Sequence, residues 1–164
     1  TEGPNGEVQS YKDANDALLA WGAKGELLAN RFPYHLVDKG VLGIEPDAAR
    51  ERALVWQKDA LGIVGVADDE RALRWIFTRG SRIEQAFWVY EGSHALFRDG
   101  ERVFLLEVET YGEPDLRALV QVKRRSSIAY SEVTGTCYYL NDEGAFSSID
   151  ILPKREGIPL SQEP

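Results

Sequence analysis

The sequence contains no methionine and only one cysteine, Cys137, among its 164 residues. A single cysteine cannot form an internal disulfide, so the chain must be stable without a disulfide framework and gives no support for an oxidising compartment. The missing initiator methionine indicates a cut or trimmed amino terminus, which fits an exported, processed protein and equally a fragment of a cytoplasmic one. The sequence leaves the localisation open between these two.

Long apolar runs are also absent. No stretch approaches the eighteen or so residues of a membrane helix, and the start TEGPNGEVQS lacks the basic and apolar regions of a signal peptide. We therefore expect a soluble chain without membrane insertion. Hydrophobic residues make up 43% of the sequence, enough at this length for one core. We predict a single domain over 1–164, with a loose arm over 1–10 and a loose tail over 154–164.

Positive charge is scarce: 19 lysines and arginines stand against 27 acidic residues, for a net charge of −8. This balance argues against nucleic acids and anionic membrane surfaces, because those partners require clustered positive charge. The one dense basic run, Lys123 to Arg125, is more typical of a solvated strand end. We expect a basic protein partner, or a charge that serves only solubility.

Patterns for metals, cofactors and nucleophiles are also missing. The only histidines, His35 and His94, lie far apart, and with one cysteine they give no zinc-site spacing. The glycines around KGVLG match no nucleotide-binding loop. Cys137 has no adjacent basic residue that would lower its pKa, so we expect a small buried strand residue. We predict no metal and no cofactor.

The first half of the chain shows helix signals. Ser10 and Asp13 resemble a capping box that opens a helix over 11–24. Pro46 and Gly62 bracket a second predicted helix over 45–62. Residues 68–80 fit helical and strand periodicity alike, and their acidic start and terminal Gly80 favour the helix.

From Arg82 onward β-branched and aromatic residues alternate with turn signals every eight to twelve residues or so, which is typical of an antiparallel meander. Helices gathered first and strands gathered after them indicate an α+β fold. We predict two or three N-terminal helices packed on a C-terminal antiparallel β-meander, a curved sheet of about five to seven strands.

The register of this meander follows from its turns. Asp99 and Gly100 predict a two-residue hairpin loop, which places Leu96 opposite Val103. A loop over 111–115 would then place Leu106 opposite Val120 on an apolar core face. The other face would carry the remaining charged side chains as solvent-exposed cross-strand pairs, such as Glu109 with Arg117, and Glu107.

An alternative hypothesis is a catalytic function. Leu96, Val103 and Leu105 are apolar on the supposedly exposed face, so the sheet could fold over a pocket at that end. His94 and Glu107 would lie on that face as a possible acid–base pair, because a histidine titrates near neutrality.

The remaining candidates are binding residues. Trp and Tyr dominate interface hot spots, so aromatic side chains on a strand and the adjacent acidic loop are the predicted binding positions: Trp88, Tyr90, Tyr111, Glu113 and Asp115. We expect a non-catalytic acidic binding protein, for example a bacterial immunity or inhibitor protein that masks a basic partner. The alternatives are a cone-shaped small-molecule binder or enzyme of the nuclear-transport-factor-2-like kind and an accessory subunit of a larger assembly.

Overall fold

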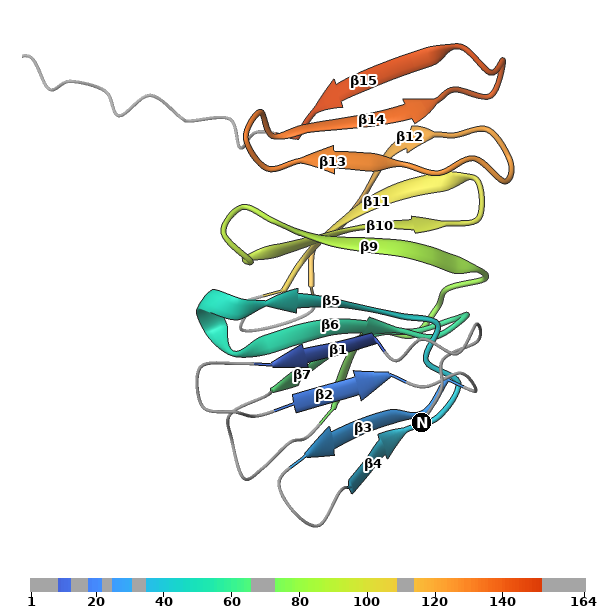
Figure 1. The fold of residues 1–164 in the computed structure, drawn as a ribbon. Helices are drawn as coiled ribbons and strands as arrows, with labels where there is room; N and C mark the ends of the chain where they lie inside the picture. Colours follow the sequence, from blue (N-terminus) through green and yellow to red (C-terminus); the bar gives the residue numbers. More distant parts are fainter. Residues whose placement is uncertain are drawn as a thin grey trace, which may run out of the picture.

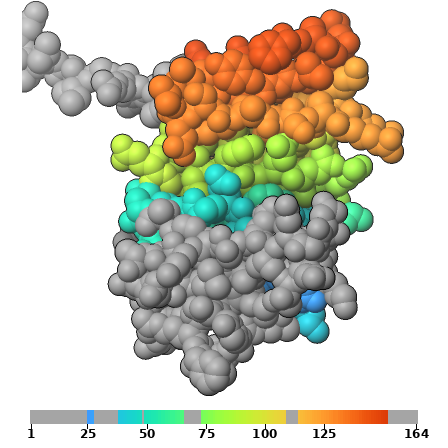
Figure 2. Space-filling model, in the orientation of Figure 1, coloured from blue at the N-terminus to red at the C-terminus, as the bar shows by residue number. Residues whose placement is uncertain are grey.

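The computed structural model describes residues 9–12, 18–21, 25–30, 35–65, 73–108 and 114–151. Its strands form four antiparallel sheets that follow one another along the chain and stack as layers (Figure 1). Within each sheet the strands are neighbours in sequence order, so every sheet is a simple meander. Figure 2 shows the later sheets as successive layers whose side chains meet.

The first two sheets come from the N-terminal half. The first contains β1 (Gln9–Lys12), β2 (Leu18–Trp21), β3 (Leu27–Asn30) and β4 (His35–Asp38). The second contains β5 (Gly43–Asp47), β6 (Arg52–Trp56), β7 (Leu61–Gly65) and β8 (Arg74–Phe77), and the single 3-10 turn η1 (Ala48–Arg50) joins β5 to β6.

The other two sheets come from the C-terminal half. The third contains β9 (Ile83–Val89), β10 (His94–Asp99), β11 (Arg102–Glu107) and β12 (Leu116–Gln121). The fourth has three strands, β13 (Ala129–Ser131), β14 (Thr136–Leu140) and β15 (Phe146–Asp150).

The predicted α+β fold is wrong, because the described residues contain no α-helix. The predicted helix over 45–62 is instead the end of β5, η1, β6 and the start of β7. The misleading feature is the run Ala53 to Trp56, in which all four residues are buried. Ala53 and Val55 face one core cluster and Leu54 and Trp56 face another, so this strand is apolar on both faces and loses the alternation that identifies a strand.

The other two predicted helices are also replaced by strands where the chain is described. Residues 9–12 and 18–21 pair with each other as β1 and β2, so the helix over 11–24 is wrong there. Within 68–80, Arg74–Phe77 is strand β8, which pairs with β7. The strand alternation of Leu73, Trp75 and Phe77 was therefore the correct pattern in this segment, and residues 66–72 lie outside the described residues.

The strands expected after Arg82 are present, but they form two sheets rather than one curved sheet. The predicted register of β10 and β11 is also displaced by two residues, because Leu96 pairs with Leu105 and not with Val103. The reason lies in Asp99, whose carboxylate accepts hydrogen bonds from the backbone and hydroxyl of Ser81, each at 2.9 Å. This anchor keeps Asp99 paired with Arg102 and moves the turn one residue along the chain.

The register between β11 and β12 differs as well. Leu106 pairs with Leu116 instead of Val120, and a bulge separates Val103 from Phe104. Because the slip in both hairpins is mostly an even number of residues, most side chains keep the face predicted for them. The predicted pairing of Glu109 with Arg117 is also wrong, because Arg117 pairs with Leu105; Glu109 itself lies outside the described residues.

The third sheet is covered on both faces. One face packs on the second sheet through a core cluster that includes Phe97 and Leu106, and the other packs on the fourth sheet through Leu96 and Val103. The predicted exposed face is therefore wrong where Leu96 and Val103 are buried, whereas Arg117 on that face is exposed as predicted. The sequence indicated that the apolar end of this sheet is covered on both faces, and it is. The cover is the packed fourth sheet and not a curve of the same sheet.

Cys137 confirms its sequence-based prediction. It lies in β14, is fully buried, and is a free thiol. Burial raises its pKa to about 11, so the neutral thiol is the form present at neutral pH.

Among the described residues, no helix has the length and apolar character needed to cross a membrane. The arm over 1–10 is described only from Gln9, and the tail over 154–164 lies outside the described residues.

Candidate functional site

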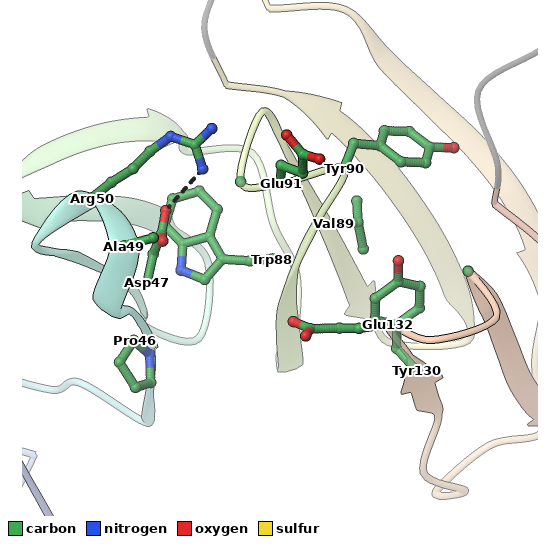
Figure 3. Close-up of a pocket in the computed structure, with 12 residues that line it drawn as sticks. Pro46, Asp47, Ala49, Arg50, Trp88, Val89, Tyr90, Glu91, Tyr130 and Glu132 are labelled. Atoms are coloured by element: carbon green, nitrogen blue, oxygen red, sulfur yellow. Dashed lines mark ion pairs between the residues drawn. The ribbon is translucent and has the colours of Figure 1, made fainter. Parts of the chain in front are cut away.

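A pocket of about 900 Å³ lies where the same ends of three successive sheets meet (Figure 3). The second sheet contributes the end of β5 and η1, the third contributes the end of β9 and the following turn, and the fourth contributes residues around the β13–β14 turn. This volume lies in the usual range for ligand pockets. The turns that line it are brought together by sheet stacking, which makes it the candidate site.

The wall from the second sheet is an ordered ion-pair network. The carboxylate of Asp47 accepts a hydrogen bond from Nε of Arg52 at 3.1 Å and forms a longer ion pair with Arg50 at 3.5 Å. The guanidinium of Arg52 also lies 4.5 Å from the ring centre of Trp88, a cation–π distance. Both arginine charges on this side of the pocket therefore face a carboxylate.

The turn between β9 and β10 completes this wall. Nη2 of Arg52 donates a hydrogen bond to the carbonyl of Gly92 at 2.6 Å. Gly92 has φ +81°, and a Cβ at this position would approach Arg50 Nη1 to 2.5 Å and Asp47 Oδ2 to 2.6 Å. Tyr90 and Glu91 also have positive φ. Only glycine suits position 92, because the backbone there is left-handed and lies in close contact with the ion-pair network.

The opposite wall is acidic and aromatic. Figure 3 shows Glu132 and Tyr130, from β13 and the turn after it, facing the second-sheet residues across the pocket. Burial raises the pKa of Tyr130, and the charge of Glu132 raises it further. Burial likewise raises the pKa of Glu45, again with a contribution from Glu132. The Glu132 charge thus acts on a group of the second sheet as well as on its own sheet.

Two of the predicted binding residues, Trp88 and Tyr90, line this pocket. Trp88 is only 6% exposed and its indole nitrogen donates to the carbonyl of Glu45 at 3.0 Å, so it is a packed wall and not an open platform. Asp115 does not line the pocket, and pairs with the exposed Arg117 at 2.7 Å. Tyr111 and Glu113 lie outside the described residues.

Sequence reasoning missed most of the pocket, since only Trp88 and Tyr90 of its lining residues were predicted. Asp47 and Arg50 were placed in a predicted helix, and no pattern marked Tyr130 or Glu132 as site residues. One available signal was the Glu91-Gly92 pair, which is a turn signal after a strand and would have ended β9 next to Trp88. The three turns meet because the sheets stack, and a local sequence pattern does not predict that stacking.

The two residues of the proposed acid–base pair, His94 and Glu107, lie next to each other but do not line the pocket. His94 and Glu107 are directly opposite each other on β10 and β11, closer than the predicted register placed them. The imidazole packs edge-on against Tyr90 with ring centres 5.0 Å apart, and Nδ1 lies 2.9 Å from the Ser93 hydroxyl. Burial lowers the pKa of His94, while the Glu107 charge opposes that shift.

This pairing predicts a titration result. We expect the His94 imidazole to titrate below its ordinary value of about 6.5, because burial disfavours the charged ring. In Glu107→Gln the midpoint should fall further, since a charge that stabilises the imidazolium is removed. The proton NMR signal of the ring, assigned with His94→Asn, measures both midpoints. An unchanged or higher midpoint in Glu107→Gln would contradict the contact.

Metal binding has no candidate in the described part of the chain, where no group of three or more His, Cys, Asp or Glu side chains could hold an ion. The basic run Lys123 to Arg125 is exposed and follows strand β12, at a strand end as predicted.

The fold and the pocket define an all-β class: stacked antiparallel sheets with a pocket formed by turns at one end. The sequence matches no protein-family model and no curated protein. Solved structures that resemble it include the WD40 domain of SCAP from fission yeast, with 13% identity and a TM-score of 0.49 over 90% of this chain and 42% of that one.

Two further similar structures are known. A complex of the fission yeast SREBP–SCAP binding domains has 14% identity and a TM-score of 0.47, over 92% of this chain and 49% of that one. PorZ, a bacterial surface component of the type-IX secretion system of Porphyromonas gingivalis, has 15% identity and a TM-score of 0.39, over 86% and 26%. This chain spans less than half of each structure, and likeness at this level assigns no family and no function.

Proposed function

We propose that this chain is a non-catalytic protein-binding module that uses the acidic pocket end of its sheets to bind a basic protein partner. The observation that carries the proposal is the charge arrangement of the pocket. Arg50 and Arg52 both face Asp47, whereas Glu91 and Glu132 are exposed and take part in no ion pair within the described residues. The pocket therefore offers negative charge to a partner, in agreement with the net charge of −8.

Binding is favoured over catalysis by the same residues. A general acid needs a carboxyl group in a buried setting, and the pocket carboxylates are either held by arginines or exposed to solvent. The curved sheet closed by helices, on which the cone-shaped alternative depended, is not present in the described residues, where both faces of the third sheet are packed. An accessory subunit of a larger assembly would also be a binding module and is compatible with this proposal.

The narrower hypothesis of a bacterial immunity or inhibitor protein has no support from the fold or from the similar structures. A protein partner agrees with the binding domains among those structures, but likeness at their TM-scores carries no argument. The proposal therefore depends on the pocket and its charges alone.

Affinity capture from a lysate of the native host tests the function. The intact chain is the bait, and an unrelated acidic protein of matched size and charge is the control for ion exchange. We expect one basic protein that only the chain retains, and an affinity that falls as salt rises from about 0.05 to about 0.5 M, because exposed charge pairs are screened. Capture of nothing specific, or of a partner with a neutral or acidic surface, would contradict the proposal.

A further inference from the structure

We infer that the pocket is an arginine-binding site, which receives an arginine side chain of the basic partner between Tyr130, Glu132 and the β9–β10 turn. This inference rests on the proposed function and adds the chemical group that is recognised. It starts from a half-open pocket of about 900 Å³, far larger than a single side chain, so a side chain and part of its backbone have room to enter.

The first argument is the division of charge inside the cavity. The arginines of the second sheet are fixed on their own side: Arg52 is 15% exposed and bonded to Asp47 and to the Gly92 carbonyl, and Arg50 also pairs with Asp47. Glu132 lies across the cavity from that network (Figure 3). A cation entering beside Glu132 therefore meets a carboxylate, while the two arginines across the cavity are held by their own partners on the second sheet.

The second argument is the aromatic lining. Tyr130 and Tyr90 are both half-buried and both line the cavity, and Val89 beside them is 3% exposed. A guanidinium stacks on such rings and can also bind a carboxylate with two parallel hydrogen bonds. Lysine is a compact, strongly hydrated charge and uses only the carboxylates, so this combination of rings and acids favours arginine.

The third argument is that the protein already contains the same arrangement. Arg52 stacks on Trp88 at 4.5 Å while Asp47 accepts its Nε hydrogen bond at 3.1 Å. The inferred site repeats this combination on the opposite wall, with a tyrosine ring and Glu132 in place of Trp88 and Asp47. The difference is that the fourth-sheet wall contributes no arginine to the lining residues, whose one arginine, Arg50, lies on the second-sheet wall.

The test uses a capped pentapeptide, Gly-Gly-Arg-Gly-Gly, and its citrulline counterpart, which has nearly the same shape without the charge. The indole N–H signal of Trp88 in the full-length chain reports binding by NMR. We expect saturable binding of the arginine peptide, at least about tenfold tighter than binding of the citrulline peptide. The reason is that only arginine can form a charge-assisted hydrogen bond with a carboxylate. Equal affinities for the two peptides, or no binding, would overturn the inference.

Matched variants locate the site. Glu132→Gln and Glu91→Gln should each weaken the binding of the arginine peptide about three- to tenfold and leave the affinity for the citrulline peptide unchanged. The controls are Glu143→Gln and Glu101→Gln, exposed acids in the turns at the opposite ends of β14 and β10, and both should bind as the unmodified chain does. Equal thermal unfolding of all four variants confirms that folding is unaffected. If the controls weaken binding as much, general charge and not the pocket binds the peptide, and the inference is wrong.

The captured partner separates the two proposals. If a basic partner is retained but binds Glu132→Gln and Glu91→Gln as tightly as the unmodified chain, the arginine site is wrong and the proposed function stands. If no basic partner is retained and the peptide also fails to bind, both are wrong. If the peptide binds in the pocket and no basic protein is retained, the arginine site stands and the protein-binding function fails.

Discussion

Phe97→Ala is expected to lower the free energy of unfolding by about 3–5 kcal/mol, the usual loss for a buried aromatic side chain. Phe97 is fully buried in β10, and its ring centre lies 5.1 Å from that of Phe77 and 5.5 Å from that of Phe104. Phe77 belongs to the second sheet, so the substitution removes a contact between layers and leaves a cavity. Urea unfolding followed by tryptophan fluorescence measures the change.

Two further variants make this result specific to burial. Phe146→Ala deletes the same ring at a position that is 74% exposed and stacks only on Tyr138, and it should cost less than about 1 kcal/mol. Phe97→Leu keeps most of the volume and should cost less than Phe97→Ala, so it gives a measurable value even if the alanine variant fails to fold. Equal losses for Phe97→Ala and Phe146→Ala would contradict the layered core.

The contact between Phe97 and Phe77 also shows why the fold class was missed. In a stack of sheets, each inner sheet is buried on both faces, and its strands read as continuous apolar runs. Ala53 to Trp56 is such a run, and because it is apolar throughout, its periodicity does not distinguish a strand from a buried helix segment. The flanking Pro46 then looked like a helix start, although it lies in β5, which pairs on one edge only, where proline is tolerated.

The C-terminal half was more predictable because its turns are marked. Asp99 and Gly100 located the hairpin to within one residue, and the residual error came from hydrogen bonds between Asp99 and Ser81, a contact between segments that a local pattern does not carry. Cys137 was correctly placed in a buried strand because it has an aromatic neighbour, Tyr138, and no adjacent basic residue.

The candidate site was predictable only in part, for a related reason. Trp88 and Tyr90 stood out as aromatic side chains on one strand, and both line the pocket. Glu132, after β13, and Asp47, the last residue of β5, carry two of its charges, but they come from two other sheets. These acids are two of the 27 in the sequence, which does not indicate which of them the stacked sheets bring together.

Glu84→Gln is expected to destabilise the protein by about 3 kcal/mol, although only a few atoms change, because it leaves a buried cation without its counter-charge. Arg98 is 3% exposed, and its Nη1 lies 2.8 Å from Oε2 of Glu84, while its Nε donates to the Gly100 carbonyl at 2.9 Å. Urea unfolding measures the loss, and Glu101→Gln, an exposed acid in the β10–β11 turn, should change stability by less than about 0.5 kcal/mol.

The double variant Glu84→Gln, Arg98→Met distinguishes a buried unpaired charge from simple loss of a contact. Methionine removes the charge and fills much of the same space, so the double variant should be more stable than Glu84→Gln alone, because a buried ion pair can be replaced by apolar groups at little cost. The Arg82 side chain, which also pairs with Glu84 at 2.7 Å, is half exposed and remains solvated in both variants. If the loss in the double variant equals the sum of the losses in Glu84→Gln and Arg98→Met alone, the two side chains are not coupled, and this ion pair is not what holds the β9–β10 ladder at that position.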